Sequence, residues 1–82
     1  METITHNFNN NLAYVNISGD DNESKKYIVQ FINTFNNEIV YEAQLGQNCW
    51  AQSSVSVNNI KIYNQENILI FDEYSNWSPY NV

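Results

Sequence analysis

The residues of this chain that could do chemistry are few and scattered. Its single histidine, His6, lies in a polar N-terminal segment, and its single cysteine, Cys49, stands beside Trp50. A catalytic histidine needs a nucleophile to serve or a carboxylate to orient it, and the residues around His6 show no such pattern. A reactive thiol needs an electropositive setting, whereas this chain is acidic. We therefore expect His6 to be a solvated side chain and Cys49 to be a small buried hydrophobe.

Acidic residues could in principle hold a metal ion or act as an acid–base pair. The loop Asp20–Ser24 is rich in the oxygen ligands that calcium prefers, but its spacing differs from that of an EF-hand loop. We interpret it as an acidic surface turn and leave weak calcium binding open. Carboxylates for glycoside hydrolysis could come from Glu38, Glu42, Asp72 and Glu73, yet a small β-domain leaves little room for a substrate cleft. One cysteine and one histidine cannot supply a zinc site, so the sequence predicts no catalytic residue, no metal site and no cofactor.

Charge and composition narrow the classes of partner. The 82 residues carry a formal net charge of −6, with three positively charged side chains, all lysines. Nucleic-acid binding requires several cations that neutralise phosphates, and an anionic membrane surface would repel the chain for the same reason. No apolar run reaches the ~20 residues that span a membrane, and Met1–Asn11 lacks the pattern of a secretory signal. We expect a protein that is cytoplasmic or assembled into a virus particle, and that binds neither nucleic acid nor membrane.

Alternating segments rich in Ile, Val, Tyr and Phe dominate the chain and predict strands rather than helices. The clearest predicted strand is 26–34. Further strands are predicted at 12–18, which alternates weakly, and at 39–45, 60–63 and 68–71, with a short apolar patch at 49–51. Short polar links predict two hairpins, one joining 26–34 to 39–45 and one joining 60–63 to 68–71. Because Ile68–Phe71 is apolar on both faces, we expect it to lie centrally in a sheet.

These strands predict an all-β fold, either a small antiparallel β-sandwich or a partly closed barrel of about six short strands. The length allows one domain, residues 1–82. We divide it into a polar N-terminal arm (1–11), a β core (12–73) and an aromatic C-terminal tail (74–82).

The aromatic residues fall into two groups. Tyr27, Phe31, Tyr41 and Phe71 occupy strand positions that predict core packing. Aromatic residues in the predicted arm, loops and tail either fill the core or anchor a partner, and for Trp77 and Tyr80 both alternatives stay open. Stacking against a sugar is a third possible use of these rings. The candidate partner-binding residues are Phe8, Trp50, Tyr74, Trp77 and Tyr80.

Five segments in the same order resemble a known type of domain: Tyr27–Ile32, Glu38–Glu42, Asn48–Ala51, Ile60–Tyr63 and Leu69–Phe71. Together they resemble the small β-domain that precedes the catalytic domain in some bacterial glycosyltransferases of the autotransporter heptosyltransferase type. The resemblance covers residues 12–73, and Asn48-x-Trp50-Ala51 is its most distinctive part. It implies a β-sandwich-like accessory module without catalysis, which must dock on a separate partner or serve as a structural piece.

Three functional hypotheses follow. The first is a non-enzymatic structural protein that docks on a large assembly, as a decoration or cement protein does on a bacteriophage virion, or that associates with itself. The second, suggested by the resemblance, is a carbohydrate-related binding module. The third, suggested by the charge of −6, is a small acidic inhibitor or regulator of a protein partner, whose binding would weaken steeply with salt.

Overall fold

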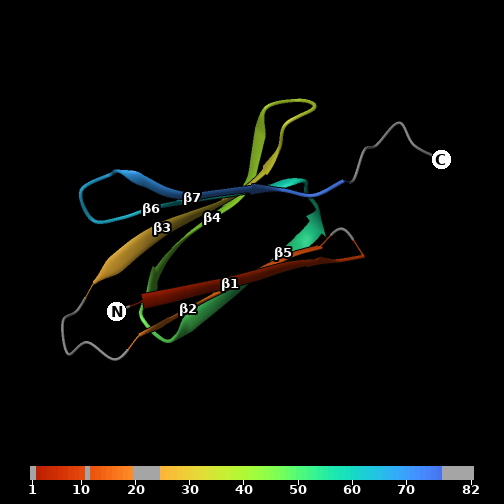
Figure 1. The fold of residues 1–82 in the computed structure, drawn as a ribbon. Helices are drawn as coiled ribbons and strands as arrows, with labels where there is room; N and C mark the ends of the chain where they lie inside the picture. The colour runs from red at the N-terminus through yellow and green to blue at the C-terminus, as the bar shows by residue number, and fades with distance from the viewer. Residues whose placement is uncertain (1, 11, 20–24, 77–82) are drawn as a thin grey trace.

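The computed structural model describes residues 2–10, 12–19 and 25–76, which form seven β-strands in two antiparallel sheets (Figure 1). Sheet A has the strand order β1-β2-β5, and sheet B has the order β4-β3-β6-β7. The strands are β1 (Glu2–Asn9), β2 (Leu12–Gly19), β3 (Lys26–Asn33), β4 (Glu38–Gly46), β5 (Cys49–Ser56), β6 (Asn59–Tyr63) and β7 (Leu69–Tyr74). The all-β prediction is confirmed, and the two separate sheets make the fold a sandwich rather than a closed barrel.

The core lies between the two sheets, where alternate residues of the inner strands meet. Phe31, Ile60 and Ile62 of sheet B and Val15 and Ile17 of sheet A are fully buried. The full set of buried hydrophobic residues is Ala13, Val15, Ile17, Tyr27, Val29, Phe31, Leu45, Ala51, Val57, Ile60 and Ile62. This set confirms the predicted inner face of residues 26–34. Burial of this apolar layer is the main force that joins the sheets.

The predicted N-terminal arm is wrong for residues 2–9, which form β1 and pair with β2 along its whole length. Ile4 and Phe8 pack against the core from this strand. The segment reads as polar because its other face carries Thr3, Thr5 and Asn7, which point to solvent. An edge strand of a sandwich needs only one apolar face, and two well-placed side chains supply it here.

A β-bulge in β4 changes which of its side chains face the core. Phe31 pairs with Tyr41 and Ile32 pairs with Ile39, so Val40 is an extra residue between the two pairs. Val40 packs against the core, and Ile39 is turned outward and is 50% exposed. Strict alternation with Tyr41 would turn Ile39 inward, but the one extra residue reverses the alternation at this point.

Tyr41 and β7 also differ from the sequence-based expectation. Tyr41 stacks on Phe31, with ring centroids 6.0 Å apart, but remains 47% exposed because β4 is an edge strand. Its predicted burial is wrong, whereas Tyr27 and Phe31 are buried and Phe71 packs against the core as predicted. The predicted central position of Ile68–Phe71 is wrong too, since β7 is the edge of sheet B. Both predicted hairpins, β3–β4 and β6–β7, are confirmed.

Asparagine rather than glycine makes the left-handed turns of this chain. Asn10, Asn37, Asn48 and Asn67 have positive φ angles, and each lies in a link between two strands. Asparagine tolerates this conformation better than other residues with a side chain, because its short amide can hydrogen-bond locally. The Asn-rich composition thus has a structural role at these four positions.

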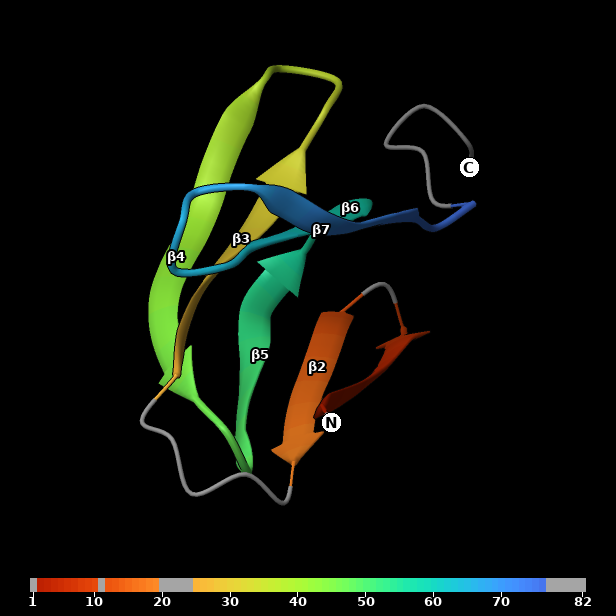
Figure 2. The same ribbon diagram turned by 60° about the vertical axis from the view of Figure 1, so that its left-hand side comes forward.

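Two buried asparagines anchor neighbouring parts of sheet B. Asn58 holds the start of the turn between β3 and β4, whose tip projects beyond the rest of the sheet (Figures 1 and 2), and Asn59 holds β7. Asn58 accepts a hydrogen bond from Thr34 N (2.9 Å) and donates one to Thr34 Oγ1 (2.7 Å). Asn59 donates to Asp72 Oδ1 (2.8 Å) and to the carbonyl of Glu73 (3.0 Å). These bonds satisfy the side chain of Asn58 and the amide nitrogen of Asn59, which would otherwise be costly to bury, and those of Asn59 fix β7 beside β6. The Oδ1 atom of Asn59 is buried without a partner among the described residues.

Candidate functional site

The residues that sequence analysis considered for catalysis do not converge. Within residues 2–10, 12–19 and 25–76, no group of three or more His, Cys, Asp or Glu side chains is placed to hold a metal ion. Glu42 and Asp72 lie at opposite ends of one cross-strand row of sheet B. Glu42 accepts a hydrogen bond from Gln30 (2.8 Å) and Asp72 accepts one from Asn59, so each carboxylate has a local structural partner. The loop Asp20–Ser24 lies outside the described residues.

His6 and Cys49 occupy different parts of sheet A. The His6 side chain is exposed, but its ring lies edge-on to Phe71 of β7, with ring centroids 5.1 Å apart, and close to Phe8. It therefore bridges the two sheets at the β1–β7 side. Cys49 is exposed, which contradicts the predicted burial. The reason is its position as the first residue of β5, directly after the turn at Gln47 and Asn48.

The surroundings of Tyr27 perturb the pKa of its phenol. Burial, followed by the nearby carboxylate of Glu2, raises the pKa of its phenol above 10.0. The side chain of Gln47 lies close enough to the hydroxyl to oppose this rise in pKa, although the buried Gln47 amide has no well-formed hydrogen bond to any described residue. This cluster sits at the end of the sandwich and gives Tyr27 a packing role.

The outer surface of sheet B carries two apolar rows separated by a polar row. We call this surface the sheet-B face and define it by strand register. The first row is Gln44, Ile28, Tyr63 and Leu69, the second is Glu42, Gln30, Lys61 and Asp72, and the third is Ile39, Ile32, Asn59 and Tyr74. Ile39, Leu69 and Tyr74 are exposed, and Ile28, Ile32 and Tyr63 are half-buried. A shallow hollow lined by Ile28, Gln30, Glu42, Tyr63 and Asn67 lies on this face.

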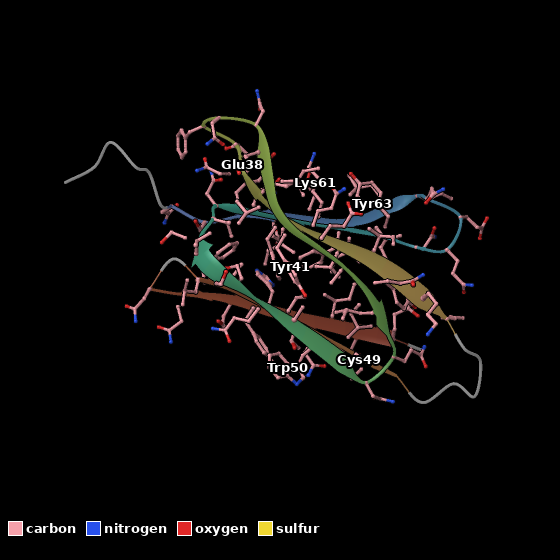
Figure 3. The ribbon with its side chains drawn as sticks, turned by 180° about the vertical axis from the view of Figure 1, so that it is seen from behind. Glu38, Tyr41, Cys49, Trp50, Lys61 and Tyr63 are labelled. Atoms are coloured by element: carbon pink, nitrogen blue, oxygen red, sulfur yellow. The ribbon has the colours of Figure 1, made fainter. Side chains whose placement is uncertain are left out.

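The outer surface of sheet A has a different chemistry. This sheet-A face consists of Thr3, Thr5, Asn7, Asn9, Leu12, Tyr14, Asn16, Ser18, Trp50 and Gln52. It carries two aromatic rings among amides and hydroxyls, and no ionisable acid or base other than the Tyr14 phenol. Trp50 points away from sheet B, on the side of the molecule opposite to Lys61 and Tyr63 (Figure 3). The two outer faces of the sandwich therefore differ in both charge and hydropathy.

The candidate partner-binding residues do not form one patch. Tyr74 is 59% exposed on the sheet-B face, and Trp50 is 60% exposed on the sheet-A face. Phe8 is half-buried and packs against the core between the sheets. Trp77 and Tyr80 lie outside the described residues. A role for any of them in binding stays a prediction.

These faces also bring together several residues that the sequence pattern did not mark as candidates. Tyr14 lies beside Trp50, and Ile32, Ile39 and Tyr63 line the sheet-B face. The alternation of residues 12–18 already separates Tyr14 and Asn16 from the buried Val15 and Ile17. This alternation was sufficient to predict that Tyr14 and Asn16 lie on the outer face of β2. It carries no information on the pairing of β2 with β5.

Comparisons with known proteins identify no relative. The chain matches no protein-family model, and we found no match among curated proteins or solved structures. The described part of the chain also contains no helix with the length and hydropathy of a membrane span.

Proposed function

We propose that this chain is a non-enzymatic interaction protein that docks through the sheet-B face on a larger protein assembly, such as a bacteriophage particle that it decorates or cements. The observation that carries the proposal is the presence of two apolar rows on the outer face of sheet B. Its site of action is then the cytoplasm or a particle assembled there.

The exposed apolar groups of the sheet-B face support protein docking. Large apolar side chains that are exposed together on one face often mark a site of protein interaction. Ile39 and Tyr74 lie at opposite ends of one row, with the half-buried Ile32 and the fully buried Asn59 between them. Side chains of this type desolvate readily and form the anchors of protein interfaces, in which aromatic residues are enriched.

The polar row between the apolar rows supports specificity. Glu42, Lys61 and Asp72 sit on the same face, in register through Gln30. Charges among apolar contacts fix the orientation of a partner more than they add affinity. The resemblance to an accessory module agrees with this proposal, because it also implies a domain that docks on something else.

The experiment compares the native protein with two charge variants of the same sign. Ile39→Glu places a carboxylate on the sheet-B face, and Gln65→Glu places one in the exposed β6–β7 turn as the matched control. Each chain is expressed in the natural source, and its cosedimentation with megadalton particles is measured by gradient centrifugation. We expect the native chain and Gln65→Glu to cosediment at a fixed number of copies per particle. The amount of Ile39→Glu that cosediments should be at least about ten-fold lower.

Two outcomes would contradict the proposal. The native chain could remain monomeric at the top of the gradient, or Ile39→Glu could cosediment as well as its control. A closed oligomer that Ile39→Glu dissociates would assign the face to a second copy instead. The salt dependence of binding distinguishes this proposal from the acidic-regulator hypothesis. The affinity of docking through apolar rows should change little between low and physiological salt, whereas that of an acidic regulator should fall steeply.

A further inference from the structure

The aromatic side chains of the sheet-A face form a platform of two rings. The ring centroids of Tyr14 and Trp50 are 5.9 Å apart, and the ring planes are inclined by 31°. The rings come from adjacent strands, because Asn16 of β2 pairs with Trp50 of β5 and Tyr14 pairs with Gln52. Trp50 is 60% exposed, so more than half of its side chain is open to solvent.

Neutral hydrogen-bonding groups surround the two rings. Asn16 lies directly across from Trp50 and donates from Nδ2 to the Tyr14 hydroxyl at 3.4 Å. Gln52 flanks Tyr14 on β5, and Asn7 and Thr5 flank Tyr14 and Asn16 on β1. The side chains of Thr5, Asn7 and Gln52 are exposed. These amides and hydroxyls offer both donors and acceptors at the level of the rings.

The absence of charge on this face is informative because the chain as a whole is acidic. The net charge is −6, yet none of the residues that define the sheet-A face is Asp, Glu, Lys or Arg. A charged ligand would find no counter-ion among these residues, and the net negative charge of the chain would repel an anion.

We propose that the sheet-A face binds neutral glycans, with a pyranose ring stacked on Trp50 and Tyr14. The C–H bonds of a pyranose carry partial positive charge and pack against the electron-rich face of an aromatic ring. The sugar hydroxyls, which both donate and accept, match the side chains of Asn16, Gln52 and Asn7. The site is an open face rather than a cleft, so we expect dissociation constants on the order of 0.1–10 mM.

This inference does not depend on the proposed function. The sheet-B face and the sheet-A face share no residue, and they lie on opposite sides of the sandwich (Figure 3). If docking through the sheet-B face were disproved, glycan binding by the sheet-A face would be unaffected, and the reverse also holds.

The test uses the full chain, labelled with nitrogen-15, and follows its amide and indole signals by NMR. The probes are maltohexaose, cellohexaose, mannohexaose and chitohexaose, each titrated to 20 times the middle of the expected affinity range, about 20 mM. We expect one or more of these neutral oligosaccharides to shift the signals of residues 14–16 and 50–52 and the indole of Trp50. Absence of shifts for all four, or shifts confined to sheet B, would overturn the proposal.

Two further comparisons test the stacking. Trp50→Ala should weaken binding of the active oligosaccharide by about ten-fold, whereas Phe35→Ala, which removes an exposed aromatic ring from the β3–β4 turn, should leave it unchanged. A heparin oligosaccharide should bind at least ten-fold more weakly than the neutral sugar. Equal binding by Trp50→Ala, or tighter binding of the anionic sugar, would contradict a neutral stacking site.

Discussion

The side-chain amide of Gln47 occupies the space that a side chain at position 19 would need. A Cβ atom built on Gly19 would lie 2.7 Å from Cδ of Gln47 and 2.8 Å from its Nε2. The neighbouring Asn48 reinforces this packing, because Asn48 Oδ1 accepts a hydrogen bond from Gly19 N (3.2 Å) and Asn48 N donates to the carbonyl of Ile17. The turn between β4 and β5 is thereby held against the end of β2, which links the two sheets.

We therefore expect Gly19→Ala to destabilise the fold by about 1 kcal/mol, the low end of what overpacking costs, because the far end of the flexible Gln47 side chain can shift. Gln47→Ala removes the obstructing amide, so adding Gly19→Ala to that variant should cost less than half as much. Urea unfolding, followed by circular dichroism, is measured for the native chain, the two single variants and the double variant. The four free energies of unfolding give the coupling between positions 19 and 47. Equal costs of Gly19→Ala in both backgrounds would show that Gln47 simply moves aside.

A second prediction concerns the left-handed asparagines. Asn67 has φ of 62° in the β6–β7 turn. Alanine in this conformation costs roughly 1–2 kcal/mol, whereas glycine adopts it without strain. Asn67→Ala should therefore lower the free energy of unfolding by about 1 kcal/mol, and Asn67→Gly should change it by less than half of that. A reversed order in thermal unfolding would contradict the assigned turn.

A third prediction tests the bulge in β4. Ile39 faces outward and Val40 packs against the core, the reverse of what the alternation of the sequence predicts. Val40→Asp should destabilise the chain by about 2 kcal/mol more than Ile39→Asp, because it brings a carboxylate toward the apolar layer. Both variants carry the same charge, so each serves as the control for the other in denaturant unfolding. The opposite ranking would show that the side chains of β4 alternate without a bulge.

A fourth prediction follows from the raised pKa of Tyr27. Burial and the carboxylate of Glu2 lift this pKa above 10.0 in the folded chain, so between about pH 10 and the folded value the folded state holds a proton that the unfolded state has lost. The stability contributed by neutral Tyr27 is present below pH 10 and declines as the pH rises further.

Tyr27→Phe should make the loss of stability above pH 10 shallower than in the native chain. The measurement is the free energy of unfolding at several pH values from 8 to 11. Tyr63→Phe is the matched control, because its hydroxyl belongs to a half-buried residue outside the core. Identical pH slopes for the native chain and Tyr27→Phe would contradict the assignment.

Local patterns in the sequence were sufficient for the hairpins and for part of the core. Tyr27, Val29 and Phe31 alternate without interruption with the residues between them. The link between residues 33 and 38 is so short that the two strands can only pair as an antiparallel hairpin. The strand β1 was also present in the pattern, since Ile4 and Phe8 share one face. Its polar outer residues obscured this signal.

The errors arose where non-local pairing decides the outcome. The bulge at Val40 is visible only once β3 and β4 are aligned, and it reverses every residue beyond it. Likewise, the apolar composition of Ile68–Phe71 predicts a central strand. Whether a strand lies at the edge or the centre of a sheet depends, however, on which other strands pair with it. The platform of Tyr14 and Trp50 joins residues 36 positions apart in the chain, so its existence depends on the pairing of β2 with β5.

The outer faces of the two sheets point in opposite directions, with a single layer of buried side chains between them. Stacked sheets lie only about 10 Å apart, so whatever holds this protein by one face presents the other face outward at a fixed height and orientation. Copies arrayed side by side on one support would turn a weak, millimolar contact of the outward face into a multivalent one, because each bound ligand end raises the local concentration seen by the next copy. The sandwich is thin enough to act as a coating that changes what a surface binds while adding little to its thickness.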